Sequence, residues 1–128
     1  MRRWNGWGDE GFNLAMPEQG QDFLASRIGN GRPLADATLE SVCAKVPQTR
    51  LNPPAELQAL IDTSPETRVR HARGQSLADW LAMRSGEFGV FPDGVAFPTT
   101  SDDVQALLSW AEEQSIHLIP YGGGTSVA

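Results

Sequence analysis

Residues 117–126 read HLIPYGGGTS, an apolar run that leads through Pro120 and Tyr121 into three consecutive glycines and two hydroxyl side chains. Glycine is entropically costly in ordered backbone, so three in a row require a reason. Without side chains, the main chain can turn sharply and direct successive N–H groups at one point, which makes an anion-binding nest. Thr125 and Ser126 add two hydroxyl donors. The stretch therefore predicts a loop for a diphosphate, with a simple tight turn as the alternative.

Other phosphate motifs fit this loop poorly. A P-loop needs a lysine directly after its last glycine, but Lys45 is the only lysine in the chain. A dinucleotide fingerprint of the GxGxxG type can be formed only by reading past Ala128. No lysine or arginine follows Arg84, so charge neutralisation at the loop is expected to come from main-chain amide dipoles. That expectation favours a buried cofactor diphosphate over a nucleotide that is released.

The residues before the loop predict a strand, a helix and a second strand. Short apolar runs at 95–97 and 117–119 are the two strands. Thr100 is a good N-cap, with Asp103 at the third helical position. Two strands joined through such a helix are parallel and connected right-handedly. The helix has its apolar side chains at helical spacing: Val104, Leu107, Leu108 and Ala111.

The upstream half predicts less regular structure. The first twenty residues are rich in glycine and predict an extended arm that is anchored by Trp4 and Trp7. Residues 20–64 predict short helices that end at glycine or proline signals. Residues 65–75 predict a connecting segment with three arginines and one histidine, and a further helix begins at Ser76.

Composition limits the classes of partner. The chain has 128 residues and a net charge of −6, and its only cysteine is Cys43, which excludes an internal disulfide and a cysteine-based metal cluster. Residues 51–128 carry four arginines against ten acidic side chains, which argues against nucleic acid as a partner. No signal peptide and no apolar run of roughly 18 residues is visible, so we expect no transmembrane segment and a cytoplasmic location.

Titratable side chains outside the loop have ordinary explanations. His71 is interpreted as a surface or hydrogen-bonding histidine rather than a cofactor contact. Cys43 is interpreted as a small core residue. Asp102 and Asp103 lie where a helix dipole favours carboxylates, so capping explains them. No pair of residues offers a nucleophile with a base, and no set has metal-ligand spacing.

Several strings resemble a known family as a set. The strings FPDGVAFP (91–98), DVQALL (103–108) and IPYGGGTS (119–126) resemble the first βαβ unit of the FAD-binding domain in the vanillyl-alcohol-oxidase/p-cresol-methylhydroxylase (PCMH) superfamily. RWNGWG (3–8) and HARGQS (71–76) look like the N-terminal arm and linker of alkylglycerone-phosphate synthases, also called alkyldihydroxyacetonephosphate synthases. The resemblance covers nearly all of this chain but only the beginning of a family member.

The resemblance implies an α+β fold. Residues 1–75 would form the arm, short helices and linker, and residues 76–128 the first βαβ unit of a PCMH-type FAD-binding domain that continues past Ala128. A chain of this extent is expected to be an N-terminal fragment that is inactive by itself, because the family's catalytic residues lie downstream and none can be named here. The resemblance implies FAD as cofactor, with its pyrophosphate on the loop formed by Pro120, Tyr121, Gly122, Gly123, Gly124, Thr125 and Ser126.

Three functions remain open from the sequence. The first is an alkylglycerone-phosphate-synthase-like flavoenzyme, in which a flavin adduct with acylglycerone phosphate allows the acyl chain to be exchanged for a fatty alcohol without net redox change. The second is an FAD-linked dehydrogenase or oxidase of 2-hydroxyacids such as D-lactate or glycolate. The third is a non-catalytic helical interaction module whose glycine loop is only a turn. The arm string RWNGWG favours the first function, and a homodimer of the full-length protein is left open.

Overall fold

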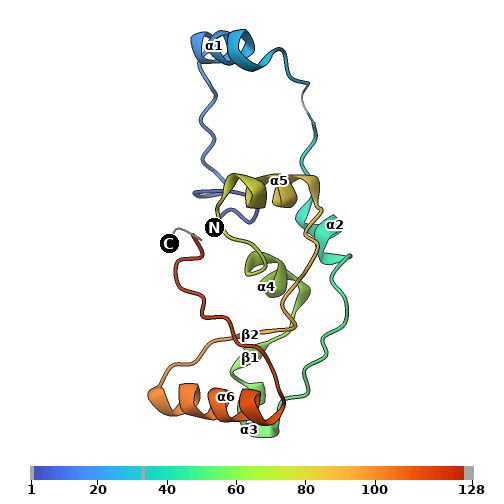
Figure 1. The fold of residues 1–128 in the computed structure, drawn as a ribbon, viewed down its shortest axis with the longest axis vertical. Helices are drawn as coiled ribbons and strands as arrows, with labels where there is room; N and C mark the ends of the chain where they lie inside the picture. Colours follow the sequence, from blue (N-terminus) through green and yellow to red (C-terminus); the bar gives the residue numbers. More distant parts are fainter. Residues whose placement is uncertain (1, 33, 126–128) are drawn as a thin grey trace.

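The computed structural model describes residues 2–32 and 34–125 and has the predicted α+β character (Figure 1). Helices follow one another along an elongated chain, with a very small sheet in its lower half. The helices are α1 (Glu18–Ile28), α2 (Leu39–Cys43), α3 (Ala55–Gln58), α4 (Pro65–Arg70), α5 (Leu77–Ser85) and α6 (Ser101–Glu113), and the strands are β1 (Ile61–Asp62) and β2 (Val95–Ala96).

The sheet pairs differently from the predicted βαβ unit. Strands β1 and β2 are antiparallel, with Ile61 opposite Ala96, and the N–H of Phe97 donates to the carbonyl of Leu60 at 2.8 Å. Residues 117–119 form no strand within the described chain, and Ile119 is 87% exposed. A parallel strand requires sheet neighbours that bury both of its faces. Here the apolar run after α6 finds none, and β2 pairs with the segment just before α4 instead.

Helix α4 corrects the prediction of a connecting segment over 65–75. Pro65 occupies a first-turn position, which suits a residue without an N–H, and the helix continues to Arg70. Periodicity missed it because the helix spans only six residues and buries Val69 together with a charged side chain, Arg68. Only the part from residue 71 onward connects α4 to α5, as predicted.

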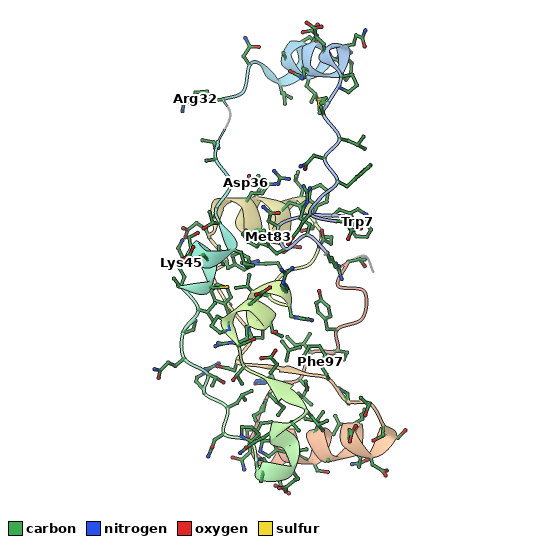
Figure 2. All side chains as sticks on the ribbon, turned by 180° about the vertical axis from the view of Figure 1, so that it is seen from behind. Trp7, Arg32, Asp36, Lys45, Met83 and Phe97 are labelled. Atoms are coloured by element: carbon green, nitrogen blue, oxygen red, sulfur yellow. The ribbon has the colours of Figure 1, made fainter. Side chains whose placement is uncertain are left out.

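The core lies between α2, α4 and α5. Phe88 is 1% exposed and stacks on Phe91 with ring centroids 5.2 Å apart. Figure 2 shows Met83 in the middle of the molecule, on α5. The buried apolar cluster comprises Val42, Val69, Met83 and Phe88.

The N-terminal arm folds back on itself rather than extending. Arg2 and Asp9 form an isolated antiparallel bridge, and the N–H of Arg3 donates to the carbonyl of Gly8 at 2.8 Å. Trp4 anchors the arm, as predicted, since its ring stacks on Phe88 at 6.4 Å. Trp7 does not, because it is 62% exposed at the surface (Figure 2). One indole therefore fixes the arm to the core.

Arg68 is the buried charged side chain of the described core, at 2% exposure. Its Nε donates to the carbonyl of Pro92 at 2.6 Å, and its Nη1 donates to the carbonyl of Pro47 at 2.7 Å. These two acceptors lie on separate segments that flank α4. The guanidinium therefore joins three parts of the chain at one buried point.

Two carboxylates have a depressed pKa in this region. The Arg50 guanidinium and N–H donate to Asp93, which holds the pKa of that carboxyl below its ordinary value. The Thr67 hydroxyl donates to Asp62 at 2.6 Å and, with the N–H of Ser64, lowers the pKa of Asp62. In both residues the ionised form is the one that the fold stabilises.

These two shifts predict acid destabilisation. A carboxyl whose folded pKa is depressed contributes stability that is fully present above its unfolded pKa of about 3.9 and is lost as the pH falls through the folded pKa. We therefore expect the free energy of unfolding to fall steadily below about pH 4. Urea unfolding from pH 7 down to pH 3 measures this, and Asp93→Asn should flatten the acid limb while Asp22→Asn on α1 should not. An acid limb of equal slope in wild type and Asp93→Asn would contradict the assignment.

Candidate functional site

The predicted glycine loop borders a surface hollow of ≈390 Å³. One wall is the segment from Ile119 to Thr125, and the other is the turn after α4, from His71 to Gly74. In Figure 1 the segment after α6 runs back past the sheet toward the first residues of the chain, where Arg2 contacts Gly123. The hollow thus joins segments that are far apart in the sequence.

Glycine is required at one position of the loop by its conformation. Gly124 has φ +66°, in the left-handed region, and a Cβ there would overlap the hydroxyl of Tyr121. A Cβ on Gly123 would make an ordinary 3.6 Å contact with Thr125, and a Cβ on Gly122 would meet open space. Gly124 therefore fixes the bend, while Gly122 and Gly123 leave the main chain bare.

Two carbonyl groups of the loop accept hydrogen bonds, whereas its glycine N–H groups donate none within the described residues. The carbonyl of Gly123 accepts from Arg2 Nη2 at 3.0 Å, and the carbonyl of Thr125 accepts from the N–H of Gln75 at 3.2 Å. The N–H groups of Gly122, Gly123 and Gly124 donate to no group in the described part of the chain. Other segments hold the loop by its acceptors, so three successive donors are left for an external anion.

His71 packs behind the loop. Its ring lies 4.6 Å from the ring of Tyr121 and 5.8 Å, edge-on, from that of Phe97, centroid to centroid. Its Nδ1 lies 2.7 Å from the Thr67 carbonyl oxygen, and since a carbonyl only accepts, Nδ1 carries the proton. His71 is thus hydrogen-bonded, as the sequence predicted, and it also lines the hollow. Through Tyr121 it also helps to fix the loop.

The arginines that lie near the glycine loop were not predicted from the sequence. The sequence led us to expect neutralisation by amide dipoles alone, because no cation follows Arg84. The structure places Arg2 against the Gly123 carbonyl and Arg73 among the residues that line the hollow, so two upstream cations lie near the loop. The available signal was the arginine-rich stretch 65–75, but nothing in the sequence indicated which of its arginines faces the glycines.

The structure brings together six of the seven predicted loop residues, and Ser126 lies outside the described residues. Within 2–32 and 34–125, no three His, Cys, Asp or Glu side chains are grouped as ligands for a metal ion. Glycine amides that have no partner among the described residues, in a hollow that Arg73 also lines, are suited to the pyrophosphate of a dinucleotide cofactor. The residues present therefore fit the diphosphate part of FAD.

The comparison with protein families gives the same cofactor. Residues 92–128, which contain β2, α6 and the glycine loop, match the model of a family described as an FAD binding domain. FAD is thereby identified as the cofactor of the domain to which this segment corresponds, and the predicted resemblance to the PCMH-type FAD-binding proteins is confirmed.

Three similar curated proteins share one name. The chain is 26% identical to an alkyldihydroxyacetonephosphate synthase of Trypanosoma brucei brucei and 25% identical to one of Caenorhabditis elegans, each over 98% of this chain. A third, from Dictyostelium discoideum, is 32% identical over 47% of the chain and 10% of that protein. The chain spans about a quarter of the length of the first two.

Solved structures support the fold. Two structures of alkyldihydroxyacetonephosphate synthase match with a TM-score of 0.76, at 21% and 22% identity, over 99% of this chain and 29% and 28% of theirs. At this identity the likeness shows the fold alone. No helix within the described residues is both long and apolar enough to cross a bilayer.

Proposed function

We propose that Pro120 to Ser126 bind the pyrophosphate of FAD in a flavoenzyme similar to alkyldihydroxyacetonephosphate synthase. The observation that carries this proposal is the set of three successive glycine N–H groups beside the hollow that have no partner within residues 2–32 and 34–125. Amides held by a rigid loop need no reorganisation when an anion binds, which favours tight binding of a compact group with several acceptor oxygens.

In this proposal the chain positions the cofactor and does not itself react. FAD supplies the flavin chemistry when it is bound. The glycine amides hold its diphosphate, the Arg2 guanidinium fixes the carbonyl side of the loop, and the Tyr121–His71 pair supports the bend from behind. We assign residues 1–75 to the supporting arm and helices and residues 76–128 to the beginning of the FAD-binding domain.

For the reaction, we propose exchange of an acyl chain for a fatty alcohol on glycerone phosphate, which the names of the similar proteins support. The alternative from the sequence, oxidation of a 2-hydroxyacid by an FAD-linked enzyme, has no relative in its favour among those described above. A cytoplasmic location and a homodimer of the full-length protein belong to the same proposal.

The test uses the protein as its gene encodes it. Purified protein should show flavin absorbance, and it should convert acylglycerone phosphate and a fatty alcohol into the alkyl product, without reducing a dye when D-lactate or glycolate is supplied. Turnover of a hydroxyacid alone would favour the alternative enzyme. A colourless protein with no affinity for added FAD would overturn the cofactor assignment and favour a non-catalytic module.

A further inference from the structure

We infer that Arg73 is the cation that neutralises the bound diphosphate, an inference that rests on the proposed function of the glycine loop. Arg73 lies in the turn after α4 and lines the hollow opposite Gly122 to Gly124. The proposal adds a residue of the linker, outside the segment that matches the FAD binding domain, to the ligand site.

The guanidinium of Arg73 is incompletely paired. Its Nε is buried and has no hydrogen-bond partner in the described structure, although the side chain as a whole is 31% exposed. A buried donor without an acceptor is costly, and native structures seldom retain one without a reason. Nε itself is closed to a ligand, but the side chain lines the hollow, so an anion bound there would pair with the exposed part of the guanidinium.

The neighbouring carboxylate does not satisfy Arg73. Asp79 Oδ1 lies 3.8 Å from Arg73 Nη1, which is beyond hydrogen-bond distance. The other oxygen of Asp79 caps α5, since it accepts from the Ser76 hydroxyl at 2.7 Å and from the Ser76 N–H at 3.2 Å. Asp79 therefore orients the guanidinium at a distance and leaves its donors for a closer acceptor.

Packing restricts the position of the guanidinium. A Cβ on Gly89 would lie 3.4 Å from Arg73 Nη2, so the arginine packs against bare backbone there. Two other nitrogen-bearing side chains near the loop already have carbonyl acceptors, since Arg2 holds the Gly123 carbonyl and His71 the Thr67 carbonyl. A planar fork with several N–H donors can bridge two oxygens of a diphosphate, which a point charge cannot.

The experiment compares three ligands on the protein as its gene encodes it. FAD, ADP and adenosine are titrated against wild type, Arg73→Gln and the control Arg32→Gln. The control removes the same charge from an exposed side chain far from the hollow (Figure 2). We expect Arg73→Gln to weaken FAD and ADP by about tenfold to a hundredfold, which is the usual loss for a charged hydrogen bond. Adenosine, which has no phosphate, should bind equally to all three proteins.

The outcomes separate this inference from the proposed function. Wild type that binds neither FAD nor ADP overturns both. Wild type that binds FAD, with Arg73→Gln equal to Arg32→Gln, overturns the role of Arg73 alone. Equal losses for ADP and adenosine would also overturn it, because a merely structural residue weakens both ligands. Circular dichroism checks folding, and if Arg73→Gln does not fold, Arg73→Lys takes its place, with a smaller loss for ADP and again none for adenosine expected.

Discussion

Replacing Gly124 by valine is expected to leave the protein colourless, with its affinity for FAD lowered by more than about 100-fold. A valine is strained at φ +66°, and its Cβ would overlap the Tyr121 hydroxyl. Either the bend at Gly124 opens, or the Tyr121 ring moves out of contact with the His71 ring. In both cases at least two glycine N–H groups move away from the diphosphate, and each is worth about 1.5–3 kcal/mol as a donor to a charged acceptor.

The measurement is flavin absorbance of the purified variant, followed by titration with FAD. Gly31→Val is the matched control, because a side chain there would meet open space and Gly31 does not line the hollow. Gly123→Val is a weaker test of the same loop, since a Cβ at Gly123 makes only an ordinary contact. Undiminished FAD affinity in a folded Gly124→Val protein would refute the loop as the diphosphate site.

Truncating Arg68 to alanine is expected to lower the free energy of unfolding by about 3–5 kcal/mol. The substitution leaves the carbonyls of Pro47 and Pro92 without their buried donor and opens a cavity beside Val69. Because a domain is stable by only about 5–15 kcal/mol, a loss of this size would partly unfold the protein at 37 °C.

Urea unfolding followed by circular dichroism measures the Arg68 effect. Arg32→Ala is the control for an exposed arginine and should change stability by less than about 0.5 kcal/mol. Arg68→Met keeps most of the apolar stem, so we expect it to be intermediate. A loss below about 1 kcal/mol for Arg68→Ala would show that water or neighbouring donors replace the guanidinium, contrary to the role described above.

Local signals carried the sequence analysis where they were strong. Thr100 and Asp103 form the reciprocal capping box that begins α6, and Leu107 and Ala111 of the predicted apolar stripe are buried. Helix α4 was missed because a burial pattern built on Arg68 resembles no amphipathic helix. The pairing of β2 depended on β1, a two-residue strand whose partner is set by tertiary structure rather than by local sequence.

Of the candidate site, the glycine loop could be predicted from the sequence, but the wall that faces it could not. The run of three glycines is recognisable from the sequence alone, because the conformational freedom of glycine is a local property. The facing wall is not, since Arg73 reaches the hollow only after α4 and the last segment pack side by side. Long-range contacts of this kind leave no periodic or spaced pattern in a single sequence.

The Arg2–Gly123 contact has a practical consequence for making the protein. The carbonyl of Arg2 also accepts from Arg70 Nη1 at 3.0 Å, so the second residue is held on both its main-chain and side-chain groups. A purification tag joined to the chain near Arg2 would therefore lie close to the proposed diphosphate loop. An uncleaved tag there would crowd the loop and lower flavin loading for a reason unrelated to the loop itself. A tag inserted in the exposed stretch 29–32 would avoid that artefact.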